Sequence, residues 1–320
     1  MPSSIPKLLT IFVIALPLVF GSYFIFQNSS FPEVKGIAVK KLGISTTEKS
    51  SNSTPKTSFI PNKKVDLPIL MYHHVRNMNE KEAKNKIQYD LTVSPAILEK
   101  QVQKLKEKGY NTVTSYQIAD YLKGQKELPK NPIMLTFDDG YKDNFDNALP
   151  ILEKYGYKAD IAILTGANGG EFMNWDELVE VVARGHGISS HTIDHCPMTL
   201  KNADGTFSQN TPVDTTYKPC SRFGIDEKLT AGQVAYEMQE SKKTLESKLG
   251  ITVSHLVYPF GKWNATSERI AKESGYLFAT TTQSPKSSIS DFENDTFGLP
   301  RYRVHGQQSG ELDNLFTKVL

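Results

Sequence analysis

The stretch Thr136-Phe137-Asp138-Asp139-Gly140 ends an apolar run with two adjacent carboxylates. About fifty positions downstream, His191-Thr192-Ile193-Asp194-His195 adds two imidazoles. Together the two segments supply three metal ligands and one spare carboxylate. A hydrolytic metal centre needs three protein ligands, an open position for water and a base that deprotonates this water. The two segments therefore predict a metal site.

Short β-rich runs alternate with helical patterns around this stretch, from residue 66 onward. We expect one helix to begin at Ser94, and others over 144–155, 175–183, 230–249 and 267–274. Strands are predicted over 68–73, 111–115, 132–137, 159–165, 187–191, 254–259, 278–282 and 298–304. Strands that alternate with helices in this way indicate either a parallel α/β barrel or a doubly wound sheet.

The positions of the unusual polar residues favour the barrel. They fall at or near the C-terminal ends of different predicted strands, at His73, Asp138, Asp139, His191, Pro259 and the region of Arg301. In an α/β barrel these ends converge on one face, whereas a doubly wound sheet would spread some of them apart. We therefore expect an α/β fold, a distorted TIM-like (β/α) barrel that forms a single catalytic domain over residues 65–320.

Residues 1–64 differ from this domain in charge and composition. They contain eight Lys and two Glu, which leaves residues 65–320 with a net charge of −4 although the whole chain carries +2. The basic character thus comes from the N-terminal region, and we expect no nucleic-acid partner. Residues 27–64 are rich in Ser, Thr, Asn, Lys and Pro, which is typical of a flexible linker.

An apolar stretch runs from Leu8 to Phe26, behind Lys7. It is long enough to span a bilayer as one helix, and it exceeds the usual core of a signal peptide. We therefore expect residues 1–26 to be an uncleaved membrane anchor. A cleaved signal peptide is the alternative, because Val19-Phe20-Gly21 loosely resembles a cleavage site. Both interpretations export the domain, either anchored to the membrane or secreted.

Cys196 and Cys220 are the two cysteines of the chain. In an oxidising compartment we expect them to pair, and the disulfide would stabilise the fold by about 3 kcal/mol through restriction of the unfolded chain. Two buried free thiols are one alternative, and a thiolate metal ligand at Cys196 is another. The polar segment 196–226, which contains both cysteines, is expected to be a lid or substrate-contacting loop, or else a surface loop.

The motifs Thr-Phe-Asp-Asp-Gly-Tyr and His-Thr-x-x-His resemble those of the polysaccharide deacetylase family, also called carbohydrate esterase family 4 or the NodB-homology domain. The similarity covers roughly residues 65–305. Further segments resemble the branch that contains poly-β-1,6-N-acetylglucosamine deacetylases. They are Ile69-Leu70-Met71-Tyr72-His73-His74-Val75, Gly109-Tyr110, Tyr258-Pro259-Phe260-Gly261 and Leu299-Pro300-Arg301.

This resemblance implies a role for each member of the two motifs. Asp139, His191 and His195 would bind a divalent metal, and Asp138 would stay unligated as the general base. Adjacent residues of an extended segment point to opposite sides, and Gly140 permits the turn that lets both carboxylates reach the site. Zinc suits imidazole and carboxylate ligands best, although Co²⁺, Ni²⁺ or Fe²⁺ would fit the same set.

The general acid is a histidine in this family, and the resemblance places it at His73, on the first strand. We expect the neighbouring His74 to point to the opposite side. His74 itself and His305 are the alternatives for the acid. The family also carries an arginine in an Arg-x-Pro-Tyr motif, but this chain has Val257-Tyr258-Pro259-Phe260 there.

Arg301 could supply the missing charge from another direction, and a solvated surface arginine is the alternative. Tyr258, Pro259 and Phe260 are expected to form the wall of a substrate groove. Trp175 could stack on a sugar ring or pack at the start of its helix.

The resemblance implies hydrolysis of N-acetyl groups on N-acetylglucosamine units of an extracellular or cell-wall polysaccharide, with release of acetate. We expect the enzyme to act as a monomer. An esterase for O-acetylated xylan and a glycan-binding pseudoenzyme are the alternatives. Poly-N-acetylglucosamine, peptidoglycan and chitin-like oligomers all present the same acetamide, so the motifs do not select among these polymers.

Overall fold

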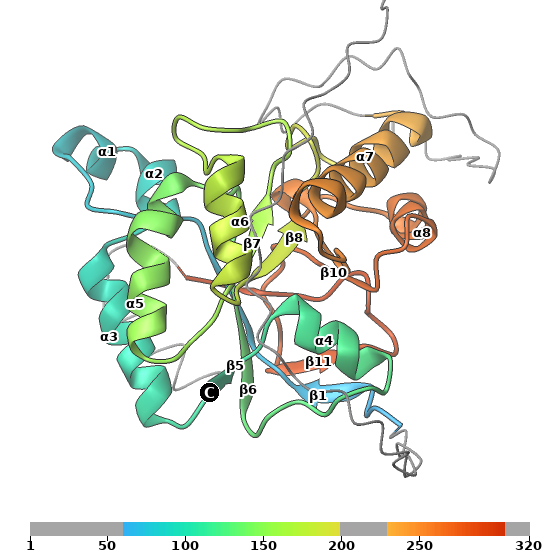
Figure 1. Ribbon diagram of the computed structural model, residues 1–320, viewed down its shortest axis with the longest axis horizontal. Coiled ribbons are helices and arrows are strands. Elements are labelled where there is room, and N and C mark those ends of the chain that lie inside the picture. Colours follow the sequence, from blue (N-terminus) through green and yellow to red (C-terminus); the bar gives the residue numbers. More distant parts are fainter. Residues whose placement is uncertain (1–59, 199–228, 305–320) are drawn as a thin grey trace, which may run out of the picture. The chain divides into compact units, whose positions relative to one another are not determined.

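A computed structural model describes residues 60–198 and 229–304, which belong to one compact unit, Lys56–Leu320 (Figure 1). The predicted anchor, most of the predicted linker, Cys220 and His305 lie outside the described residues. Among the residues that are described, no helix has both the length and the apolar character needed to cross a bilayer.

The centre of the fold is an eight-stranded parallel sheet, in the order β10-β9-β8-β7-β6-β2-β12, with β5 paired to β6. The strands are β2 (Ile69–Tyr72), β5 (Asn111–Thr112), β6 (Pro132–Phe137), β7 (Asp160–Ile163), β8 (Gly187–Ser190), β9 (His255–Val257), β10 (Phe278–Thr280) and β12 (Tyr302–Arg303). Each lies within a predicted strand.

The sheet curves until its two ends approach each other. The N–H of Leu299 donates to the carbonyl of Ala279 at 3.0 Å, and the N–H of Thr281 donates to the carbonyl of Leu299 at 2.9 Å. These bonds join β10 to the segment that leads into β12. The expected distorted (β/α) barrel is therefore confirmed.

Helices cover the outside of the strands (Figure 1). Helix α3 (Pro95–Glu107) packs against α5 (Leu149–Lys154), and α7 (Ala231–Leu249) packs against α6 (Trp175–Ala183) and α8 (Ala265–Glu273). The side chain of Ser94 caps α3, as its position in the sequence indicates. A π-helical turn, η1 (Asn144–Ala148), opens the helix predicted over 144–155.

Several short elements were not predicted. Helices α1 (Glu80–Lys84) and α2 (Lys86–Leu91) bury no residue, so they lack an apolar period. Helix α4 (Ser115–Leu122) falls partly in a predicted strand. Strand β1 (Lys64–Asp66) pairs with β11 (Ile289–Asp291), and β3 (His74–Val75) pairs with β4 (Thr92–Val93).

The barrel places the site at one end of its strands. Asp138 and Asp139 directly follow β6, His73 follows β2, and His191 follows β8. Arg301 is a correction to the expected arrangement. It does not end the last strand but precedes β12, in the segment that closes the barrel against β10.

Candidate metal-dependent active site

The backbone after β6 separates the two adjacent carboxylates. The N–H of Asp138 still donates to the carbonyl of Tyr72, as in a strand, at 2.9 Å. Asp139 and Gly140 then adopt left-handed conformations, with φ of 73° and 75°. Such a conformation is uncommon for a residue other than glycine and costs about 1–3 kcal/mol. This turn directs Asp138 and Asp139 to different partners.

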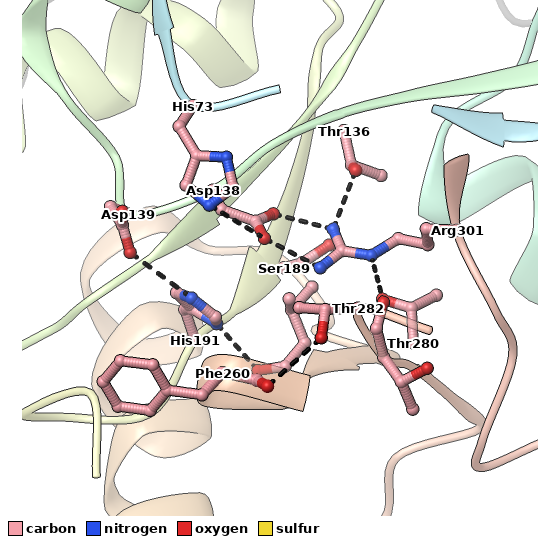
Figure 2. A network of polar contacts seen from close by, with 12 residues as sticks. His73, Thr136, Asp138, Asp139, Ser189, His191, Phe260, Thr280, Thr282 and Arg301 are labelled. Atoms are coloured by element: carbon pink, nitrogen blue, oxygen red, sulfur yellow. Dashed lines mark hydrogen bonds and ion pairs between the residues drawn. The ribbon is translucent and has the colours of Figure 1, made fainter. Parts of the chain in front are cut away.

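Asp138 forms a buried, bidentate ion pair with Arg301. The two nitrogens Nη1 and Nη2 of Arg301 lie 2.8 and 2.7 Å from the two carboxylate oxygens (Figure 2). Burial alone would raise the pKa of Asp138, but the Arg301 guanidinium outweighs it and lowers this pKa to about 2. Asp138 is therefore held ionised.

Arg301 is fixed by two further bonds. Its Nη1 donates to Oγ1 of Thr136 at 2.9 Å, and its Nε donates to the carbonyl of Thr281 at 2.8 Å. The side chain is fully buried. The structure thus brings Arg301 to Asp138, and the alternative of a solvated surface arginine is wrong.

Asp139 faces the two predicted histidines. Its Oδ1 lies 3.4 Å from Nε2 of His191 and 3.4 Å from Nε2 of His195. One ligand atom from each of the three residues lies within 4.8 Å of the others, and all three side chains are buried. Among the described residues, Oδ1 of Asp139 has no hydrogen-bond partner.

These three residues fit a divalent metal. Nδ1 of His191 donates to the carbonyl of Val257 at 2.8 Å, which leaves the lone pair of Nε2 directed toward Asp139. Burial lowers the pKa of His195 to about 3 and keeps this ring neutral. A metal ligand must be a neutral imidazole or an ionised carboxylate. A bound cation would also satisfy the buried oxygen of Asp139.

His73 stands across from Asp138, with Nε2 at 4.0 Å from Oδ2 (Figure 2). Burial lowers the pKa of His73 to about 4, although the nearby charges of Asp138 and Asp139 raise it. The predicted base Asp138, the predicted acid His73 and the predicted metal ligands therefore surround one space.

The comparisons with known proteins agree with this geometry. The family profile described as polysaccharide deacetylase matches residues 125–279. A Bacillus subtilis protein named for the same family, YxkH, is 28% identical over 87% of this chain and 82% of its own length. The Streptococcus pyogenes deacetylase PplD, solved in complex with acetate, is 26% identical with a TM-score of 0.62, over 81% of this chain and 99% of that one.

The chain is similar in sequence and in fold to polysaccharide deacetylases. The poly-beta-1,6-N-acetyl-D-glucosamine N-deacetylase of Escherichia coli is 26% identical over 68% of the chain. The similarity to the E. coli enzyme spans 34% of that enzyme's length. The family profile covers the two motifs but neither His73 nor Arg301.

A cavity of about 940 Å³ opens over this site. His73, Asp138, Asp139, His191 and His195 line one part of it. The other part extends toward α1 and α2.

Of the three residues expected to form the groove wall, only Phe260 lines the cavity. Its ring packs edge-on against His195. Tyr258 and Pro259 are buried, and Tyr258 stacks on Trp263. Trp175 also lies away from the cavity, where it packs against the core with the Lys248 ammonium over its ring.

The expected direction of His74 is wrong. His74 does not point away from the site, because it lines the same cavity as His73. The reason is that β2 ends before His73 and β3 begins at His74, so the alternation of one continuous strand does not apply.

Cys196 is buried and is not a free thiol. Its pairing with Cys220 stays a prediction.

Two residues that support the site were not predicted. The Asn144 side chain donates to the carbonyl of His73 at 2.6 Å, and the Asp143 carboxylate accepts the N–H of Val75 at 3.0 Å. Both begin the helix that follows the carboxylate motif, where an Asp or Asn usually indicates a local cap. Here their side chains bond to the backbone of His73 and Val75 instead.

Proposed function

We propose that this protein hydrolyses the N-acetyl group of N-acetylglucosamine units in an extracytoplasmic glycan and releases acetate. The observation that carries the proposal is that the two adjacent carboxylates have different partners. Asp138 is held by Arg301 opposite His73, while Asp139 joins His191 and His195. The similarity to an N-deacetylase of poly-β-1,6-N-acetylglucosamine supports this choice of substrate.

Asp139, His191 and His195 would hold the metal, for which zinc suits the ligands best. Such a cation would acidify a bound water and polarise the acetyl carbonyl. The chain's own groups then handle the protons. Asp138 accepts the proton of the attacking water, and the bidentate contact with Arg301 keeps its carboxylate in one orientation.

His73 completes the reaction by protonating the departing nitrogen. An amine leaves poorly as an anion, so cleavage of the C–N bond needs a general acid at this point. His73 is neutral at rest, because burial lowers its pKa to about 4. Nε2 of His73 lies 4.0 Å from Oδ2 of Asp138, so the proton that Asp138 takes from water can pass to His73 through one bridging water. One proton thus moves from water to the amine, and the hydroxide becomes part of acetate.

We further propose that the domain works outside the cytoplasm as a monomer, attached through residues 1–26 or secreted after their cleavage. The apolar run from Leu8 to Phe26 supports this location. The polymers considered above are extracellular or belong to the cell wall.

The test is acetate release from poly-β-1,6-N-acetylglucosamine, N-acetylglucosamine oligomers, peptidoglycan and O-acetylated xylan. We expect release from an N-acetylated glycan, and a loss of roughly 10²–10⁴-fold in kcat/KM for Asp138→Asn, because the base is removed. Thermal unfolding of the variant would show that it still folds. Release from xylan alone would replace the proposal with an esterase, and no release from any substrate would favour a binding module.

A further inference from the structure

The active-site cavity contains a second histidine that the proposed reaction does not use. His74 is the first residue of β3 and lines the cavity beside His73. The residue is buried, with 8% of its surface exposed. Burial of a polar ring at the wall of a cavity raises the question of what it binds.

Two contacts fix the orientation of this ring. Nδ1 of His74 lies 2.7 Å from Oδ2 of Asp143, and the ring stacks on Tyr141 with centroids 3.7 Å apart. Asp143 is itself held, because its Oδ1 accepts the N–H of Val75 and the side-chain amide of Asn144, each at 3.0 Å. The hydrogen bond sets the direction of the imidazole and the stack sets its plane, so the ring is preorganised.

The other ring nitrogen is left for a ligand. A carboxylate only accepts hydrogen bonds, so Nδ1 of His74 carries a proton toward Asp143. When this is the only proton on the ring, Nε2 is an acceptor, and no described residue bonds to it. Nε2 is accessible from the cavity, so water or a ligand can donate a hydrogen bond to it.

The cavity next to His74 is large enough for sugar units. Its volume of about 940 Å³ is in the range of pockets that enclose whole small molecules. Arg76 fixes the far wall, since its guanidinium lies 2.5 Å from Glu82, 3.2 Å from Gln88 and 3.5 Å from Asp143. Helices α1 and α2 are thereby tied to the carboxylate that orients His74. A glycan that reached the metal site through this part would pass the imidazole.

We infer that His74 is a glycan-binding residue, whose Nε2 accepts a hydrogen bond from a sugar hydroxyl group in the part of the cavity under α1 and α2. This inference rests on the proposed function, since it specifies how that site recognises a sugar. Hydroxyl groups are the donors that every pyranose unit offers. His74 would therefore favour glycans over small acetyl compounds, which do not fill this part.

The test compares the whole chain with His74→Phe, which keeps a ring against Tyr141 but removes Nε2. We expect kcat/KM for an N-acetylglucosamine oligomer to fall roughly 3- to 10-fold, mainly through KM, as for the loss of one hydrogen bond. Hydrolysis of 4-nitrophenyl acetate should not change. Val179→Ala, at an exposed position on α6 outside the cavity, is the matched control.

Oligomers that lack single hydroxyl groups identify the bonding partner. One deoxy oligomer should react more slowly with the unmodified chain and lose nothing further with His74→Phe, because the two changes remove the same bond. An equal fall for the oligomer and the small ester would show a structural role and overturn the inference. So would unchanged kinetics on the oligomer.

Direct binding separates this inference from the proposed function. If the unmodified chain releases no acetate from any N-acetylated glycan, the proposed reaction fails, but calorimetry with the oligomer still tests His74. Weaker binding by His74→Phe would then support the glycan contact, and equal affinity would overturn it.

Discussion

At the scale of single residues, the site depends on a charge pair buried in the barrel. Arg301 is fully buried and bonds to Asp138, Thr136 and the carbonyl of Thr281. The sequence suggested Arg301 because the usual arginine motif is absent. It could not show the contact, since 163 positions separate Arg301 from Asp138 and the contact depends on how the barrel closes. The same applies to His74, whose direction depends on where β2 ends.

Replacement of Arg301 by Met should lower the free energy of unfolding by about 3–5 kcal/mol, because it leaves the Asp138 carboxylate buried without its partner. Urea denaturation would measure the change. The double variant Asp138→Asn/Arg301→Met should recover part of this loss, since it buries no unpaired charge. If Arg301→Met unfolded at the same free energy as the unmodified protein, the ion pair would not contribute to stability.

At the scale of elements, all eight strands of the sheet lie within predicted strands. Strands such as β2, β6 and β7 are buried along their length and therefore appear as apolar segments. The predicted strands were too long by three to five residues at β5, β7, β9 and β12. The short helices α1 and α2 were missed because neither buries an apolar face. They belong to the cavity wall, which explains why the substrate side of the site was the least predictable part.

A buried polar network joins four of these strands, and its loss should destabilise the barrel. Oγ of Ser189 on β8 donates to Asp160 on β7 and lies 2.7 Å from Nδ1 of His255 on β9, whose Nε2 lies 3.0 Å from Oγ1 of Thr280 on β10. Ser189→Ala would remove one hydrogen bond from the buried Asp160 carboxylate and one from Nδ1 of the buried His255, so we expect a loss of about 1–3 kcal/mol in urea denaturation.

The exposed Ser247 on α7 provides the control for this network. Ser247→Ala should leave the stability within experimental error. If Ser189→Ala also left the stability unchanged, the network would not contribute to the stability of the sheet.

At the scale of the whole molecule, metal binding should be linked to folding. A cation held by Asp139, His191 and His195 binds only the folded chain, and at a hundred times its dissociation constant it should add about 2.7 kcal/mol of stability. Thermal unfolding of metal-stripped protein with and without Zn²⁺ would measure the shift. His195→Ala should abolish this shift, because it removes one of the three ligands.

His186→Asn serves as the matched control. His186 is buried, and its Nε2 lies 3.0 Å from Glu153, away from the metal ligands. This variant should be less stable but should still gain stability from Zn²⁺. A shift that survives in His195→Ala would show that the metal binds elsewhere.

The closure of the barrel also determines when the protein can become active. Arg301 lies in the segment that pairs with β10, near the C-terminal end of the described residues, whereas Asp138 lies near the middle of the chain. A chain that ends before Arg301 would contain both carboxylates and every histidine that lines the cavity, yet the Asp138 carboxylate would lack its guanidinium partner. The proposed reaction therefore waits until the segment with Arg301 has been synthesised and has docked against β10.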